Sequence, residues 1–128
     1  MKTGYQKYKK TSVHSASREK LLLMMYEGAI KFVKRAIVAI ETNDIAARGE
    51  NVGRAFDIIM ELNNTLNHEV GADVSHQLEQ LYFYMTDQLT KANVSGNIEH
   101  LNNTLRILET LYDGWLQAIE QLKKQGKL

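Results

Sequence analysis

The chain has 128 residues, of which 44% are hydrophobic and 24% charged, values that are typical of one globular domain and exclude whole-chain disorder. The net charge of +1 gives no general attraction to nucleic acid, and the absence of cysteine excludes disulfide bonds and thiolate metal sites. No apolar run approaches the ~18 residues that a membrane-spanning helix requires, so we expect no membrane insertion.

Residues 1–16 form a polar, basic segment ahead of the first predicted helix. It contains four lysines and no acidic residue, with Tyr5 and Tyr8 among its few apolar side chains. We predict a tail that is flexible or ordered only conditionally. A solvated tail explains these lysines better than binding to nucleic acid or acidic lipid. The two tyrosines are more informative, because aromatic side chains in a polar tail can fold back onto exposed apolar rows.

Four amphipathic segments follow the tail and carry helix-capping signals. Ser17, Asp44 and Asn97 are suited to cap helix N-termini, and Gly71 supplies a permissive backbone in the loop before the third segment. We predict helices over residues 17–41, 44–67, 73–92 and 97–124. Long helices joined by short loops predict an all-α, antiparallel up-down-up-down four-helix bundle, which forms a single domain over residues 17–125.

Several of these helices are apolar on more faces than a bundle needs. Residues 21–26, LLLMMY, point all the way round the first helix at roughly 100° per residue. The fourth helix carries a second apolar row, roughly 100° from its core-facing row, made of Ile107, Leu111, Gly114 and Ala118. In the third helix the run LYFYM requires at least one aromatic to face outward.

Two explanations fit this surplus of apolar surface. The first is wide packing within the bundle, together with ordinary exposed apolar residues. The second is a docking surface for an amphipathic partner segment, or for another copy of the chain. Glycines inside the helices, at Gly28, Gly53 and Gly114, are compatible with both, since they allow either close packing in the bundle or a groove for a partner helix.

The residue patterns of catalytic and metal sites are missing. None of the four histidines completes the Glu-x-x-His pattern of carboxylate-bridged metal bundles, and there is no Gly-rich phosphate loop or nucleophile elbow. We therefore expect no metal, no cofactor and no enzymatic activity. A signalling phosphotransfer bundle with His100 as phosphate acceptor remains an alternative, although the surrounding NIEHLNNTL gives it little support.

Four segments match one known family in the same order along the chain. The first contains Tyr5 and Gln6, then SAS at residues 15–17, and then the block ending in MYEGAI. The others are GRAFDIIMELNNTLN, LEQLYFYM and LETLYDGWLQAI. Together they cover nearly the whole chain, which resembles the FliS family of flagellin-specific export chaperones of bacteria. Arg18 departs from the pattern, since many relatives have proline at this first helical position, where proline is favourable but optional.

The resemblance implies a cytoplasmic helical bundle that binds the C-terminal helical segment of flagellin. Such binding prevents premature polymerisation and keeps flagellin competent for type III export. The resemblance also implies an export-gate protein as a second partner, and a tail that covers part of the binding surface in the free chaperone.

From the apolar rows we hypothesise two grooves for the partner. The first comprises Ile107, Leu111, Gly114 and Ala118, with Tyr82 or Phe83 from the third helix. The second comprises Tyr26, Ile30 and Ile58. Tyr5 and Tyr8 would act as a displaceable lid over these surfaces. The main alternative is a homodimer that uses the same rows as its interface.

Overall fold

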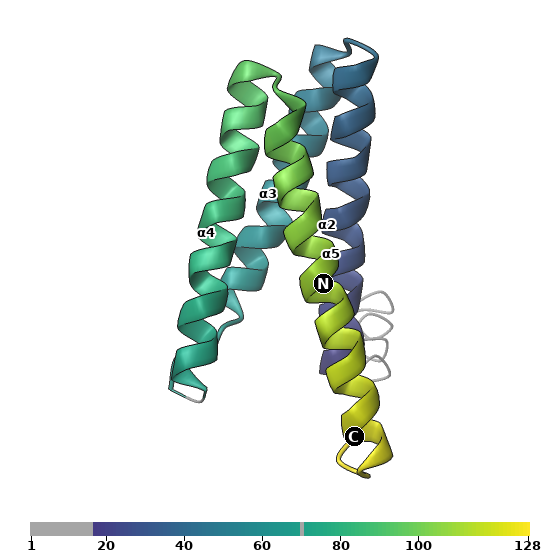
Figure 1. Ribbon diagram of the computed structural model, residues 1–128, viewed down its shortest axis with the longest axis vertical. Coiled ribbons are helices and arrows are strands. Elements are labelled where there is room, and N and C mark those ends of the chain that lie inside the picture. Colours follow the sequence, from purple (N-terminus) through teal and green to yellow (C-terminus); the bar gives the residue numbers. More distant parts are fainter. Residues whose placement is uncertain (1–16, 70) are drawn as a thin grey trace, which may run out of the picture.

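The computed structural model describes residues 17–69 and 71–128, which form four long helices and no strand. The helices are α2 (Arg18–Glu41), α3 (Ile45–Asn64), α4 (Ala72–Ser95) and α5 (Ile98–Lys124). Successive helices run in opposite directions (Figure 1). The predicted tail with Tyr5 and Tyr8 lies outside the described residues.

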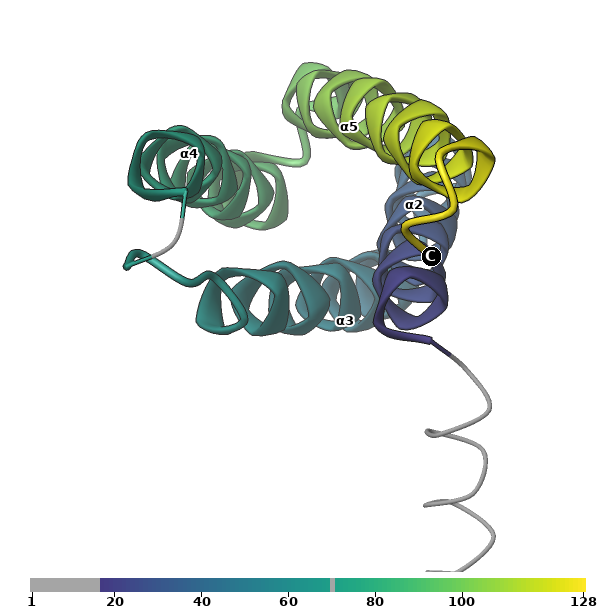
Figure 2. The same cartoon turned by 90° about the horizontal axis from the view of Figure 1, so that it is seen from below.

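The four helices surround a common core, and each packs against two others. Seen along the bundle, α2 lies between α3 and α5, and α4 closes the ring from the other side (Figure 2). Helices that follow each other in the chain are therefore neighbours in space, and α2 and α4 face each other across the core. The predicted all-α, antiparallel up-down-up-down bundle is confirmed.

The predicted capping residues account for where three of the helices begin. Ser17 Oγ accepts a hydrogen bond from Lys20 N at 3.2 Å, Asp44 Oδ1 from Ala47 N at 3.0 Å, and Asn97 Oδ1 from Glu99 N at 3.0 Å. Each bond satisfies a backbone donor that the first helical turn leaves free.

Two helices end at positions other than those predicted. Helix α4 continues to Ser95, past the predicted end at residue 92, because Gly96 is the first residue to adopt a left-handed conformation, with φ 70°. Helix α3 ends earlier than predicted, at Asn64, where Thr65 turns its hydroxyl back to the carbonyl of Leu62 at 2.7 Å.

The core combines mostly small buried residues of α2 with larger aliphatic residues of the other three helices. Ala29, Val33 and Ala36 are fully buried along α2, which lets this helix approach its neighbours closely. The large side chains that fill the remaining space include Ile59, Leu62, Met85, Leu89, Leu101 and Leu108. Helix α2 is thus covered by the bundle along one full face.

A pair of tyrosines links α2 to α4 across the centre of the bundle. The hydroxyl groups of Tyr26 and Tyr82 are 2.6 Å apart, and the two side chains are 0% and 1% exposed. Burial raises the pKa of both phenols above their usual value, which favours the neutral, hydrogen-bonded form. Assigning Tyr26 and Tyr82 to a partner-binding surface is therefore wrong, because each hydroxyl already has its partner inside the core.

Removing both hydroxyl groups of this pair should lower the free energy of unfolding by less than the sum of the two single removals. Tyr82→Phe leaves the Tyr26 hydroxyl buried without its partner, so we expect a loss of about 1–3 kcal/mol. In the double variant Tyr26→Phe and Tyr82→Phe no hydroxyl is left unpaired, so its loss should be smaller than the sum of the two single losses. Urea unfolding followed by circular dichroism measures all four proteins, and strictly additive losses would contradict the coupling.

Candidate functional site

The contact between α4 and α5 is fixed near their connecting loop by three polar side chains. Gln88 on α4 is only 6% exposed, and its Oε1 accepts a hydrogen bond from Asn103 Nδ2 at 3.1 Å. The same oxygen lies 3.0 Å from Nδ1 of His100 on α5. A buried amide held from two sides sets the rotation of both helices about their axes. The contact therefore identifies which side of α4 faces α5, and which side of α5 faces α4, along the whole of each helix.

The predicted apolar row of α5 continues from this contact towards the C-terminus. Ile107 and Leu111 follow Asn103 at four-residue steps, so they lie on the same side of α5 and are half-buried. Gly114 and Ala118 come next and are exposed. Both views show the ribbons of α4 and α5 diverging in this direction (Figures 1 and 2). Gly114 and Ala118 are thus left uncovered, whereas Ile107 and Leu111 are partly buried against the core.

Helix α4 adds an aromatic residue on the same side. Tyr84 precedes Gln88 by four residues, so it lies one turn away on the face towards α5, and it is 44% exposed. We call Tyr84 together with Ile107, Leu111, Gly114 and Ala118 the seam surface. None of its members is charged, which makes it suitable for an apolar stripe of a partner helix.

Phe83 lies elsewhere on α4. It is five residues from Gln88 and therefore about 140° away around the helix. Although it is 48% exposed, it points away from the seam surface. The sequence left the direction of these successive aromatics open, and the Gln88 contact identifies Tyr84, not Tyr82 or Phe83, as the aromatic beside the α5 row.

The three helical glycines have different surroundings. A Cβ at Gly28 would meet Ile58 Cδ1 at 3.3 Å, so this glycine allows α2 and α3 to pack closely. A Cβ at Gly53 or Gly114 would meet nothing within 4 Å. Close packing within the bundle therefore explains Gly28 but does not explain Gly114.

Ile58 does not share a groove with Ile30, contrary to the prediction. Ile58 packs against Gly28 between α2 and α3, whereas Ile30 projects about 160° from Gly28 around α2, towards α5. Of the residues predicted for the second groove, Ile30 lines a surface cavity together with residues of α5. Tyr26 is in the core and Ile58 fills the contact between α2 and α3.

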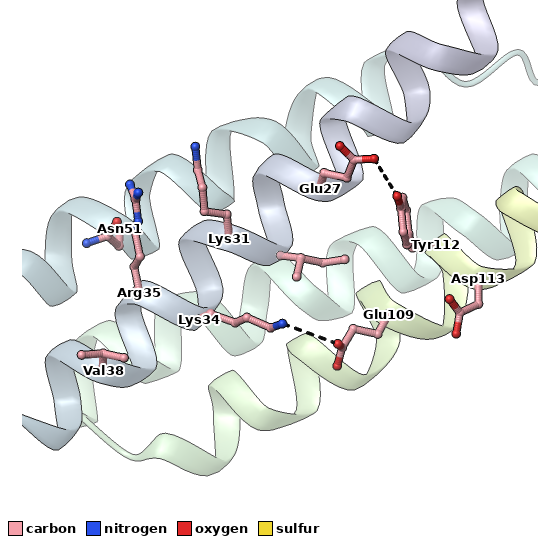
Figure 3. A pocket seen from close by; sticks show the side chains of 10 residues that line it. Glu27, Lys31, Lys34, Arg35, Val38, Asn51, Glu109, Tyr112 and Asp113 are labelled. Carbon is pink, nitrogen blue, oxygen red and sulfur yellow. Dashed lines mark hydrogen bonds and ion pairs between the residues drawn. The ribbon is translucent and has the colours of Figure 1, made fainter.

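A second surface, which we call the α2/α5 groove, lies on the other side of α5 (Figure 3). Its volume is about 820 Å³. The lining residues are Glu27, Ile30, Lys31, Lys34, Arg35, Val38, Asn51, Glu109, Tyr112 and Asp113. Two polar bridges cross it. Tyr112 Oη donates to Glu27 Oε2 at 2.6 Å, and Lys34 Nζ lies 4.0 Å from Glu109 Oε2.

The bridge at Tyr112 is stable towards deprotonation at neutral pH. Its hydrogen bond to the Glu27 carboxylate raises the pKa of Tyr112, because ionising the phenol would place two negative charges side by side. Tyr112 is half-buried and also packs against the core, so its place in the apolar periodicity of α5 does not indicate a groove. The groove becomes apparent only once α2 is known to be the neighbour of α5, and periodicity does not show which helices are neighbours.

The described histidines lie in structural contacts. His100 belongs to the Gln88 contact, and His68 Nε2 lies 3.5 Å from Glu79 Oε2 at the surface. Within residues 17–69 and 71–128, no group of three His, Asp or Glu side chains is arranged to hold a metal ion. None of the described helices combines the length and hydropathy needed to cross a lipid bilayer.

Comparison with known proteins places the chain in one family. The model of the family described as flagellar protein FliS matches residues 1–122. The flagellar secretion chaperone FliS of Vibrio cholerae is 35% identical, with 91% of this chain and 89% of that protein covered. The protein of the same name from Bacillus subtilis is 35% identical, with coverage of 94% and 89%, and that from Campylobacter jejuni is 36% identical, with coverage of 90% and 90%.

A solved structure described as a flagellar chaperone from bacteria has the same fold. It superposes with a TM-score of 0.77 at 21% identity, and the match covers 91% of this chain and 95% of that one. On the match to the family model and to relatives over nearly their whole length, this chain belongs to the FliS family of flagellar proteins.

Proposed function

We propose that this chain is a flagellar secretion chaperone whose cargo is flagellin, held by its C-terminal helical segment. The family supports this role, since its curated relatives are named flagellar secretion chaperones. Binding shields the cargo segment, prevents premature polymerisation and keeps flagellin ready for export. No nucleotide is required, because binding alone shifts the equilibrium towards the capped monomer.

The observation that carries the proposal is the open seam surface. Polymerisation segments of this kind are amphipathic and unfolded before assembly, so they need an apolar surface against which to form helix. Ile107 and Leu111 offer a half-buried floor, and Gly114 and Ala118 leave room above it. A cargo helix there would lie against α5 on the side where α4 diverges.

The remaining parts of the proposal rest on the resemblance to the family. Tyr5 and Tyr8 act as a lid that the cargo displaces, an export-gate protein receives the loaded chaperone, and the complex forms in the cytoplasm. This role is that of a binding protein and not of an enzyme.

Placing a charge on the seam surface should weaken cargo binding without unfolding the bundle. Ala118 is exposed, so Ala118→Glu adds a carboxylate that an apolar cargo stripe would have to desolvate. We expect at least tenfold weaker binding of the flagellin C-terminal segment in calorimetric titration, and the same circular dichroism as the unmodified chain. Val94→Glu is the matched control, because Val94 is 82% exposed on α4 and lies outside the seam surface. Equal affinity of both variants would contradict the assignment.

Adding a methyl group at Gly114 should raise the stability of the bundle and at the same time lower its affinity for the cargo. Gly114→Ala removes a helix-breaking residue where a Cβ meets nothing, so we expect about 0.5–1 kcal/mol of added stability. Cargo affinity should fall several-fold, because the added methyl group keeps the cargo backbone away. Gly53→Ala on α3 has the same open surroundings and should stabilise the chain equally with no loss of affinity. If Gly114→Ala binds as well as Gly53→Ala, the cargo does not approach Gly114.

Light scattering after size-exclusion chromatography tests the homodimer alternative. A monomer mass for the free chain and a one-to-one complex with the flagellin segment are expected. A dimer that the flagellin segment does not dissociate would assign the apolar rows to self-association.

A further inference from the structure

The α2/α5 groove differs chemically from the seam surface, because its α2 wall carries three cations and the carboxylate of Glu27, whereas its α5 wall carries two carboxylates. Lys31, Lys34 and Arg35 line it from α2, and Glu109 and Asp113 line it from α5 (Figure 3). Ile30 and Val38 are apolar residues of the α2 wall, with Lys34 one turn from each of them, and Val38 is 55% exposed.

Four of these charges are left without an opposite charge in the described structure. Lys34 and Glu109 face each other at 4.0 Å, whereas Lys31 and Arg35 lie over the ring of Phe32, at 4.7 and 5.8 Å from its centroid. Neither of these two cations, nor Asp113, forms an ion pair among residues 17–69 and 71–128. The Phe32 ring attracts both cations without neutralising them, and both side chains are exposed. Among the described residues, Glu27 on the α2 wall has no cation in ion-pair contact either, and its carboxylate accepts from the neutral Tyr112 hydroxyl. The α2 wall thus presents free positive charge at Lys31 and Arg35 with a carboxylate at the Glu27 end, and the α5 wall presents free negative charge at Asp113.

The dimensions of the groove correspond to a short helix. The lining residues on α2 extend from Glu27 to Val38, which at 1.5 Å per residue is about 17 Å. A partner helix of about three turns would span this length. Its apolar side chains would contact Ile30 and Val38, one on each side of the Lys34–Glu109 pair.

We propose that the α2/α5 groove binds an amphipathic helix of a second protein, one with acidic side chains along one flank and basic side chains along the other. The acidic flank lies against Lys31 and Arg35, and the basic flank against Asp113. The proposal rests on the proposed function only in taking the seam surface as the cargo site, so that this helix comes from a protein other than the cargo.

The two surfaces are separated by α5 itself. Ile107 of the seam surface and Glu109 of the groove project about 160° apart around this helix. A segment in the groove therefore leaves the seam surface open, and one chain holds cargo and second partner together. The uncharged seam surface and the charged groove select different segments, because a partner without flanking charges leaves the free charges of the groove unmatched.

Three synthetic 18-residue helical peptides with one common leucine stripe test the charge pattern. In the first the two flanks are acidic and basic, in the second both are acidic, and in the third both are basic. Titrated into the full chain at low ionic strength, the mixed peptide should bind at least fivefold more tightly than either of the others. Equal affinity of the three peptides would overturn the proposal.

A charge reversal on one wall provides the matching test on the protein. Lys31→Glu with Arg35→Glu makes both walls acidic, so the variant should bind the mixed peptide at least tenfold more weakly and should prefer the peptide with two basic flanks. Both positions are exposed, and circular dichroism verifies that the fold is kept. Arg106→Glu with Lys123→Glu is the control, with the same change of net charge at exposed positions of α5 outside the groove. Loss of binding in the control as large as in the groove variant would show that only net charge matters.

Competition with the flagellin C-terminal segment separates this proposal from the proposed function. Preloading the chain with that segment should leave the affinity for the mixed peptide unchanged within twofold. Displacement of the peptide by the segment would overturn the second-partner proposal and make the groove part of the cargo site. If the segment does not bind at all, the proposed function fails, and the peptide series still decides whether the groove recognises a charged helix.

Discussion

The buried amide of Gln88, held by Asn103 and placed against His100, is the contact on which the binding surfaces depend. It joins α4 to α5 close to their loop and fixes which side of each helix faces the other. Beyond it the ribbons separate (Figure 1), and in the same register Ile107 and Leu111 are half-buried and Gly114 and Ala118 are exposed. Helices α4 and α5 are thus held together by a polar contact near their loop, and the seam surface lies where the two helices are further apart.

Most of the fold follows from local rules that the sequence displays directly. The caps at Ser17, Asp44 and Asn97 were predicted correctly because capping depends on a side chain and the backbone within three residues of it. The bundle topology was predicted because helix lengths and short loops leave few alternatives. Information of this kind is local, and a single sequence contains it.

The candidate site was predicted only in part, because it depends on the rotation of each helix against its neighbours. The row from Ile107 to Ala118 was predicted from periodicity; Ile107 and Leu111 are half-buried and Gly114 and Ala118 are exposed, and their contact with a partner stays a prediction. Tyr26 and Tyr82 were misassigned because a buried phenol with a phenol partner has the same sequence signature as an exposed aromatic. The charged groove was missed, since charges on α2 and α5 form opposite walls only when the two helices are neighbours.

The exposed position of Gly114 in α5 also bears on how readily the C-terminal turns of this helix open. From Gly114 to the end of the helix only Trp115 and Ile119 are not exposed, so few tertiary contacts hold these turns in place. Backbone amides there are protected mainly by the hydrogen bonds of the helix itself, and these open more readily than those of the packed core. The C-terminal turns of α5 are therefore the part of the bundle whose hydrogen exchange slows most when a neighbouring segment covers them.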